Sequence, residues 1–136
     1  EISNKNFHID VEQNANAFNT KKSIEIVYGI RNFIGNANKF SNKNIYISIT
    51  SDSENSSISI EDDGLGFPKD ILSKIGEPYI KSVLSKNKSS TGLGLGIFIG
   101  KTLLEKNKAT LLIRNSETRG GAEIKIEWSN KDLKSI

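Results

Sequence analysis

The sequence predicts an α+β fold, a two-layer α/β sandwich in which helices cover one face of a mixed sheet of about five strands. Three observations lead to this prediction. Short segments alternate apolar and polar residues, so one face of the sheet is wet and the other is covered. Two longer segments repeat apolar residues at helical spacing, and polar or glycine-containing turns separate the strands. Helices on one side of a mostly antiparallel sheet satisfy all three.

The first half of the chain is predicted to form a strand and then a long helix. Residues Phe7 to Val11 alternate in polarity and read as a short strand. Asn19 or Thr20 is expected to cap a helix that runs to about Phe40. The apolar residues of this helix recur at three- and four-residue steps: Ile24, Val27, Ile30, Ile34 and Ala37.

A hairpin is predicted next, because isoleucines alternate with polar residues on both sides of a polar turn at Asp52 to Ser56. These isoleucines are Ile45, Ile47, Ile49, Ile58 and Ile60. A loop at residues 62–67 and a short helix around Asp70 to Ile75 follow. Residues 76–91 show little periodicity and are interpreted as a mobile loop.

A second long helix is predicted from near Gly94 to about Asn107, followed by two strands. The expected buried face of this helix consists of Leu95, Phe98, Ile99, Thr102 and Leu103. The strands are expected at residues 110–114 and 122–128, with Gly120 and Gly121 in the turn between them. In the last strand the residues facing one way are Ala122, Ile124, Ile126 and Trp128.

Composition indicates one domain spanning residues 1–136 and excludes several classes of site. The chain has no cysteine and one histidine, which excludes disulfides, thiolate zinc sites and multi-histidine metal sites. No apolar run approaches the ~20 residues that a membrane span needs. The net charge of +3 is small and its lysines are scattered, so neither nucleic-acid binding nor membrane contact is expected. Because the chain begins at Glu1 rather than Met, it is interpreted as an excised fragment.

Three clusters carry the chemistry. On the first long helix, Asn32, Asn36 and Lys39 are spaced i, i+4, i+7 and share one face. Amide oxygens suit a magnesium ion and a lysine suits phosphate, although a solvated polar face would look the same.

The second cluster comes directly after a strand, where Asp62, Gly64 and Gly66 form a DxGxG pattern. Glycines allow the backbone to approach a flat ligand, and the carboxylate can accept a hydrogen bond from an adenine amino group. A tight turn is the alternative.

The third cluster is expected directly before a helix, where unpaired N–H groups favour phosphate. It consists of Thr91, Gly92, Leu93, Gly94 and Leu95, followed by Gly96. It is neither a Walker loop nor a Rossmann fingerprint, because no Lys-Ser/Thr pair follows and no βαβ unit surrounds it.

In this order the clusters resemble the superfamily of ATPases shared by DNA gyrase, heat-shock chaperones, histidine kinases and MutL, called GHKL, whose ATP-binding fold is the Bergerat fold. Residues 32–41 look like the asparagine box of sensor histidine kinases, and the two glycine clusters look like their first and second glycine boxes. Tyr79 stands where the family has the phenylalanine of its phenylalanine box. Three segments look like the RegB/PrrB/ActS group of redox-responsive sensor kinases: GEPY, TLLEKN and SETRGGAEIKIEW.

The resemblance implies roles for individual residues. Asp62 would bind the adenine amino group, Asn36 would coordinate Mg²⁺, and Asn32 would support the nucleotide and the attacking group. Lys39 would contact phosphate. The second glycine box would supply phosphate contacts and the hinge of an ATP lid at residues 76–91.

Asn32 separates the subfamilies, because the gyrase, chaperone and MutL branches carry a glutamate there as general base. Asparagine cannot accept that proton. The resemblance therefore implies ATP binding and transfer of the γ-phosphoryl group to a histidine. The alternatives are a GHKL-type ATPase or serine kinase, and a degenerate nucleotide-binding module without catalysis.

The acceptor histidine is expected on a separate dimerisation domain that this chain lacks. His8 lies in a strand pattern without the proline that follows the family's acceptor, so it is interpreted as structural. The implied partners are ATP, that acceptor domain and a response regulator. The fragment is expected to be monomeric, and the full protein a homodimer in the inner membrane of a bacterium with this domain in the cytoplasm.

Besides Tyr79, four positions depart from the usual family pattern: Gly29, Gly35, Asn38 and Ser90. Each of the two glycines is expected to cost ~1 kcal/mol of helix stability.

Overall fold

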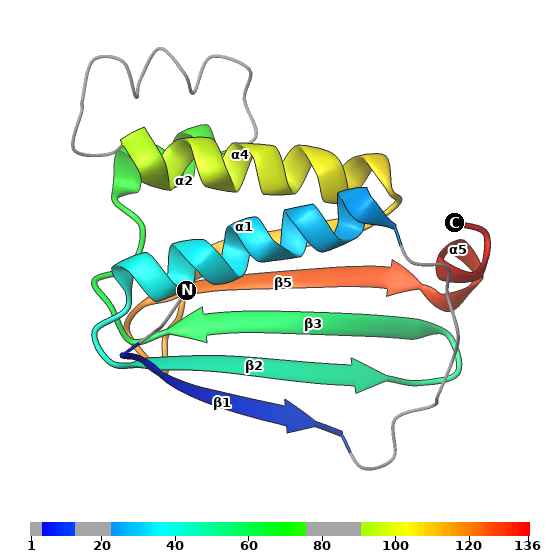
Figure 1. Ribbon diagram of the computed structural model, residues 1–136, viewed down its shortest axis with the longest axis horizontal. Helices are drawn as coiled ribbons and strands as arrows, with labels where there is room; N and C mark the ends of the chain where they lie inside the picture. The colour runs from blue at the N-terminus through cyan, green and yellow to red at the C-terminus, as the bar shows by residue number, and fades with distance from the viewer. Residues whose placement is uncertain (1–3, 13–22, 76–90) are drawn as a thin grey trace.

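The described part of the chain folds into one mixed five-stranded sheet with two long helices on one of its faces, in the computed structural model of the protein (Figure 1). The structure describes residues 4–12, 23–75 and 91–136. The strands are β1 (Asn6–Val11), β2 (Asn44–Ser51), β3 (Asn55–Asp62), β4 (Thr110–Asn115) and β5 (Ala122–Ser129). The predicted strands and fold class are confirmed.

The strands lie in the order β1-β2-β3-β5-β4. β1 pairs with β2 in parallel, and the other three pairs are antiparallel. Burial alternates most regularly along β5, as its sequence pattern predicts, whereas all six residues of the edge strand β1 are exposed. On β5, all four residues predicted to share a face are buried: Ala122, Ile124, Ile126 and Trp128.

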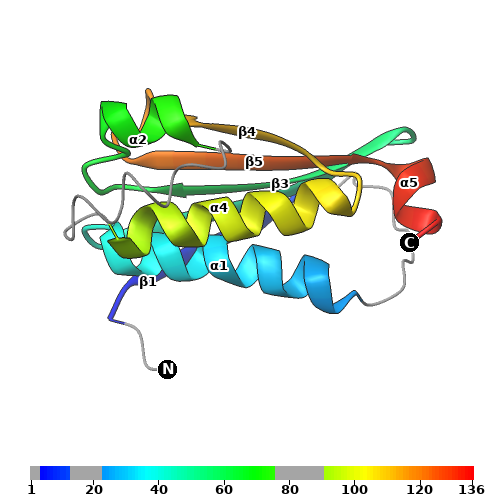
Figure 2. The same cartoon turned by 90° about the horizontal axis from the view of Figure 1, so that it is seen from above.

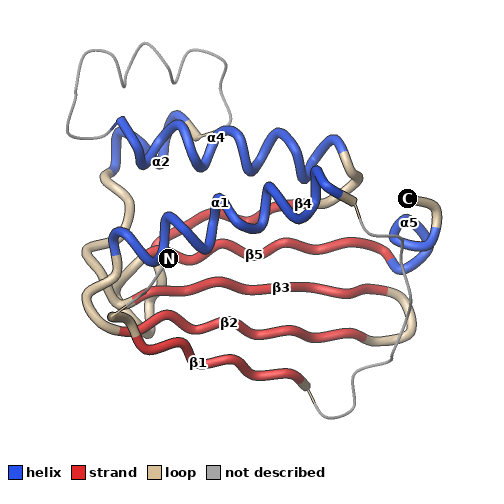
Figure 3. Tube along the Cα trace, viewed as in Figure 1, coloured by secondary structure: helices blue, strands red, loops and turns tan. Residues whose placement is uncertain are grey.

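Two long helices, α1 (Ile24–Phe40) and α4 (Thr91–Lys106), cover the dry face and lie beside each other (Figure 2). Two short helices complete the described elements, α2 (Lys69–Lys74) and α5 (Asn130–Lys134). The loops at residues 41–43, 63–68 and 116–121 gather at one end of the sheet (Figure 3). No helix in the described ranges combines the length and apolar character needed to cross a bilayer.

Helix α1 begins later than the sequence predicts. Ser23 is the N-cap residue, and its hydroxyl accepts a hydrogen bond from the main-chain N–H of Ile26 at 3.3 Å. Because Ser23 is the N-cap, the prediction that Asn19 or Thr20 caps α1 is wrong. Those two residues lie outside the described residues. A serine with an acid, here Glu25, in the first turn is a good helix start.

The buried stripe of α1 also differs from the prediction. Ile24 and Val27 are 80% and 40% exposed, although both belong to the predicted apolar face. The buried residues are Gly29, Phe33, Asn36 and Ala37, because α4 packs along this side of α1. Two of these four positions carry glycine or asparagine, so apolar periodicity does not reveal the stripe.

Glycines bring the two long helices close together. A Cβ on Gly29 would lie 2.9 Å from Leu104 Cγ and 3.3 Å from the Gly100 carbonyl oxygen. A Cβ on Gly100 would lie 2.7 Å from the ring of Phe33. The helix propensity lost at Gly29 is therefore exchanged for close packing against α4. A Cβ on Gly35 would meet no atom within 4 Å.

Helix α4 starts at Thr91, three residues before the predicted start. Its buried residues include Ile97, Gly100 and Leu104, whereas Thr102 is exposed and Phe98, Ile99 and Leu103 are only half-buried. The predicted buried face of α4 is therefore wrong, because it is shifted by about one residue along the helix. Gly100 belongs to the interface although it has no apolar side chain.

The C-terminal end of α4 closes in a Schellman motif. Ala109 N–H donates to the Leu104 carbonyl oxygen at 3.0 Å and Lys108 N–H to the Glu105 carbonyl oxygen at 3.0 Å. Lys108 takes the left-handed position, with φ of 71°, that glycine usually occupies.

Helix α5 fastens the opposite end of the sheet. The Asn130 side chain accepts a hydrogen bond from the Ser56 hydroxyl at 2.5 Å and donates to the Asp52 carbonyl oxygen at 2.8 Å. This ties the β2–β3 turn to α5.

Candidate functional site

A buried carboxylate marks the end of the sheet where the loops gather. Asp62 is the last residue of β3, and it is 3% exposed. Its side chain lies on the helix-covered face, because Ile58 and Ile60 precede it at alternate positions. The strand ends here because Gly64 and Gly66 turn the chain away from the sheet.

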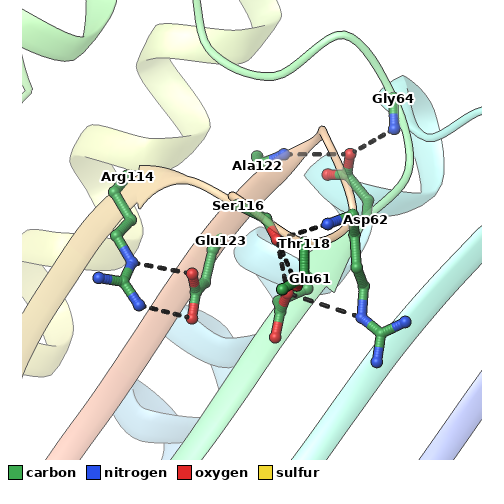
Figure 4. Close-up of polar contacts among 9 residues, drawn as sticks. Glu61, Asp62, Gly64, Arg114, Ser116, Thr118, Ala122 and Glu123 are labelled. Atoms are coloured by element: carbon green, nitrogen blue, oxygen red, sulfur yellow. Dashed lines mark hydrogen bonds and ion pairs between the residues drawn. The ribbon is translucent and has the colours of Figure 1, made fainter.

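One oxygen of this carboxylate is already bonded. Asp62 Oδ1 accepts hydrogen bonds from the main-chain N–H of Gly64 at 2.9 Å and of Ala122 at 3.3 Å (Figure 4). Among the described residues no donor to Oδ2 is found. Burial raises the pKa of the Asp62 carboxyl, while the two N–H donors act in the opposite direction. The site thus presents one acceptor oxygen with its direction fixed by the main chain.

Asp62 lines a small cavity of about 20 Å³ together with residues from α1, the 63–68 loop and β5. Its other lining residues are Asn36, Phe40, Gly66, Phe67 and Ala122. The structure therefore brings Asn36 of the first predicted cluster together with Asp62 and Gly66 of the second.

Three predicted residues lie on α1, but they do not all reach this cavity. Asn36 is 9% exposed, and no hydrogen-bond partner for its side chain is found among the described residues. The Asn32 amide donates to the Tyr28 carbonyl oxygen at 2.8 Å, and its Oδ1 lies 3.9 Å from the Cβ position of Gly96 on α4. Lys39 is exposed, with Nζ 5.3 Å from the centre of the Phe40 ring.

Both glycines of the first predicted glycine box are required where they lie. A Cβ on Gly64 would stand 2.2 Å from the Phe40 carbonyl oxygen. Gly66 has φ of 81°, in the left-handed region that favours glycine. These two residues let the loop close over the end of α1.

The second predicted glycine box is part of α4 rather than a loop before it. Helix α4 begins at Thr91 and includes Gly92, Leu93, Gly94 and Leu95, so the prediction that these residues precede the helix is wrong. The first turn of a helix still carries unpaired N–H groups. Residues 76–90, with Tyr79 and Ser90, lie outside the described residues.

Sequence reasoning missed the contribution of the β4–β5 turn. A Cβ on Gly121 would lie 2.2 Å from both the main-chain oxygen and Oδ1 of Asp62. The Asn115 side chain makes two hydrogen bonds to the main chain of Phe67. Its Oδ1 accepts from the Phe67 N–H at 2.6 Å, and its Nδ2 donates to the Phe67 carbonyl oxygen at 3.1 Å. The only sequence signal was the pair of glycines at 120 and 121, which was interpreted as a turn.

Sequence reasoning also missed a second carboxylate. Asp63 accepts from the main-chain N–H groups of Asn42, Lys43 and Asn44, all within 3.1 Å, and from the Asn44 side chain at 3.0 Å. Burial acts to raise the pKa of Asp63, but these donors outweigh it and lower the pKa to about 2. Asp63 thereby fixes the loop after α1 beside the pocket.

The wet face of the sheet supports the same turn. Ser116 donates to Glu61 Oε2 at 2.8 Å, and Arg119 approaches the same oxygen at 3.6 Å (Figure 4). The Arg119 guanidinium also lies over the Tyr46 ring at 3.5 Å, and His8 stacks against that ring at 4.8 Å. His8 thus lies in β1, in agreement with the prediction that it belongs to a strand.

The protein side chains at this site suit a magnesium ion only if substrate phosphates and waters supply most of its ligands. No group of three or more His, Cys, Asp or Glu side chains that could hold a metal is found within the described ranges. Asn36 supplies one buried amide oxygen, which fits an ion that keeps several waters and binds substrate phosphates.

Comparison with known proteins agrees with this geometry. The family model described as "Histidine kinase-, DNA gyrase B-, and HSP90-like ATPase" matches residues 21–132. The sensor histidine kinase RegB of Cereibacter sphaeroides is 33% identical over 119 residues, covering 76% of this chain and 26% of RegB. The histidine protein kinase SaeS of Staphylococcus epidermidis is 32% identical over 90 residues, covering 63% of this chain and 26% of SaeS. The chain spans about a quarter of the length of these relatives.

Solved structures share the fold. The catalytic domain of histidine kinase ThkA superposes with a TM-score of 0.69 at 18% identity, covering 93% of this chain and 78% of that one. The mycobacterial sensor histidine kinase MprB gives 0.63 at 19% identity, covering 93% and 82%. The chain belongs to the histidine kinase-, DNA gyrase B- and HSP90-like ATPase family.

Proposed function

We propose that this chain binds Mg-ATP and transfers the γ-phosphoryl group to a histidine on a separate dimerisation domain of a two-component sensor kinase. The observation that carries the proposal is the buried Asp62 carboxylate, whose Oδ1 is bonded by two main-chain N–H groups beside the cavity that Asn36 lines. Asp62 Oδ2 is then an oriented acceptor for the 6-amino group of adenine.

The polar residues of α1 suit phosphoryl transfer better than hydrolysis. Asn32 carries an amide where hydrolysis needs a base, and its Nδ2 is bonded to the Tyr28 carbonyl oxygen. In the transfer, the bond from the γ-phosphorus to the bridging oxygen breaks, and a phosphorus–nitrogen bond forms to the imidazole. Asn32 then orients the reacting groups, and Lys39 neutralises phosphate charge. Catalysis therefore depends on positioning and charge neutralisation.

Magnesium, when bound, neutralises phosphate charge and orients the phosphates. Asn36 would hold it through its amide oxygen. The start of α4, from Thr91 to Leu95, would place N–H groups toward the phosphates.

The whole protein would contain this single catalytic domain, an acceptor domain that dimerises, and a membrane region, with this domain in the cytoplasm. The phosphorylated histidine would then pass its phosphoryl group to a response regulator. Similarity to RegB and SaeS, both histidine kinases by name, supports the kinase activity in this proposal.

A radiolabel experiment tests the transfer. With γ-labelled Mg-ATP, the chain alone is expected to remain unlabelled, and a separately made acceptor domain of the same kinase is expected to acquire acid-labile label when mixed with it. The rate should be low, because no covalent link raises the effective concentration. Label on this chain alone, or none on the acceptor domain at any concentration, would overturn the proposal.

The magnesium role is tested by Asn36→Ala, with Asn55→Ala as the matched control at the other end of the sheet. The wild type should bind ATP more tightly with magnesium than without it in calorimetric titrations. Asn36→Ala should lose that difference, and Asn55→Ala should keep it. An unchanged ratio in Asn36→Ala would refute the assignment.

A further inference from the structure

Asn115 connects two segments that line the cavity beside Asp62 and lie far apart in the sequence. It is the last residue of β4, where it pairs with Ala122 of β5. Ala122 donates its N–H to Asp62 Oδ1 at 3.3 Å. On its other side, Asn115 bonds both main-chain polar groups of Phe67. The β4–β5 pair therefore bonds both the Asp62 carboxylate and the loop that contains Phe67.

The chemistry of this contact requires an amide side chain. Oδ1 accepts from the Phe67 N–H at 2.6 Å while Nδ2 donates to the Phe67 carbonyl oxygen at 3.1 Å. An ionised carboxylate has no donor, and a glutamine is one methylene longer. The contact is also tight, because a Cβ on Gly66 would lie 2.7 Å from Asn115 Oδ1.

The loop that Asn115 holds forms one wall of the cavity. Gly66 and Phe67 line it together with Asp62, and the cavity measures about 20 Å³. The cavity has room for about one water, so a base would lie beside it rather than inside it. A displacement of this wall would change the distance between such a base and the carboxylate. Phe67 itself is 3% exposed, so the wall is anchored in the core.

We propose that Asn115 is a positioning residue for the base of the bound nucleotide, an inference that rests on the proposed binding of ATP. It holds the Gly66–Phe67 wall at the separation from Asp62 at which a 6-amino purine reaches the carboxylate. A residue that only fastened the fold would change stability and would weaken all nucleotides alike.

The test is a thermodynamic cycle in which the Asn115 side chain and the 6-amino group of the ligand are each removed, singly and together. Mg-ATP is compared by calorimetry with purine riboside 5′-triphosphate, which lacks only the 6-amino group. The wild type is expected to prefer ATP about tenfold or more, as for one hydrogen bond to a charged group. In Asn115→Ala the preference should fall to about threefold or less. Asn55→Ala, which removes the same side chain from the far end of the sheet, should keep the wild-type preference.

Asn115→Asp gives a second variant of nearly the same volume. This variant keeps an acceptor for the Phe67 N–H, but its second carboxylate oxygen would face the Phe67 carbonyl oxygen without a hydrogen to share. Its preference for ATP over purine riboside 5′-triphosphate should therefore fall as in Asn115→Ala. An unchanged preference in a folded variant, or an equal loss for both nucleotides, would overturn the positioning role. A wild type without preference would instead refute the assignment of Asp62.

Amide hydrogen exchange in the wild type needs no variant. The Phe67 amide is expected to be protected before any nucleotide is added, because Asn115 already accepts its hydrogen bond. Exchange as fast as in an unstructured chain would overturn the proposal even where both variants fail to fold.

Discussion

Burial raises the pKa of the Asp62 carboxyl, and no donor to its Oδ2 is found among the described residues. A group whose folded pKa is raised stabilises the fold below its unfolded pKa and loses that contribution as the pH rises through the folded value. Ionisation of the Asp62 carboxyl therefore lowers the stability of the fold.

Asp62→Asn tests this balance. At pH 7 to 8 the variant should melt at an equal or higher temperature than the wild type, because the buried charge is gone and Oδ1 still accepts from Gly64 and Ala122. The advantage should disappear in acid, where the wild-type carboxyl is neutral. ATP affinity should fall about tenfold or more, with a smaller effect on GTP, whose base lacks the 6-amino group. A lower melting temperature together with equal losses for both nucleotides would mean that Asp62 only shapes the turn.

Asp63 behaves in the opposite way, because hydrogen bonds lower its pKa to about 2. Its contribution is fully present above the unfolded pKa near ~3.9 and is lost as the pH falls toward 2. Asp63→Asn should therefore be less stable than the wild type at pH 7 and should show a flatter fall in melting temperature between pH 4 and pH 2. Parallel acid curves for the two proteins would contradict this prediction.

At this scale the sequence predicts part of the site. Asp62, Gly64, Gly66 and Asn36 were expected in the pocket region, and the structure places them together. Asn115 was missed because its role lies in a contact 48 residues away in the chain. An isolated asparagine at a strand end gives no local pattern that reveals such a partner.

Helices α1 and α4 show the same limit for whole elements. The five described strands all lie where the sequence predicts them, although neither face of β1 is covered. The helix faces were predicted less well, because Gly29 and Gly100 make the interface by having no side chain. Counting apolar residues cannot detect such positions.

Two alanine substitutions on α1 separate helix propensity from helix packing. Gly35→Ala should stabilise the protein by roughly 0.5–1 kcal/mol, because the glycine is exposed and the new Cβ meets nothing. Gly29→Ala gains the same propensity but overpacks against Leu104 and the Gly100 carbonyl oxygen, which costs about 1–3 kcal/mol.

Thermal unfolding followed by circular dichroism gives the comparison. Each kcal/mol should shift the melting temperature by about 4 °C in a domain of this size. Equal shifts in both variants would show that α1 and α4 do not need the close approach at Gly29.

Across the whole molecule, the two ends of the sheet have separate tasks. The end with Asp62, Asp63 and the β4–β5 turn forms the pocket, while the other end is closed by α5 and the Asn130 contacts. Mg-ATP should bind at one end but raise the melting temperature of the whole domain, because a single domain of this size unfolds cooperatively. At 100 times its dissociation constant it should add ~2.7 kcal/mol, whereas Asp62→Asn at the same concentration should gain less. No shift at millimolar nucleotide would contradict ATP binding.

Trp128 gives this protein a built-in optical probe. It is the only tryptophan in the chain, it is 4% exposed, and its indole N–H donates to the Asn107 carbonyl oxygen at 3.1 Å. It lies six residues along β5 from Ala122, which is roughly 20 Å of extended strand. Its emission should therefore be blue-shifted in the folded protein, move to longer wavelength on unfolding, and remain unchanged when nucleotide fills the pocket. Fluorescence melting curves can then compare free and ATP-bound protein without any quenching by the ligand.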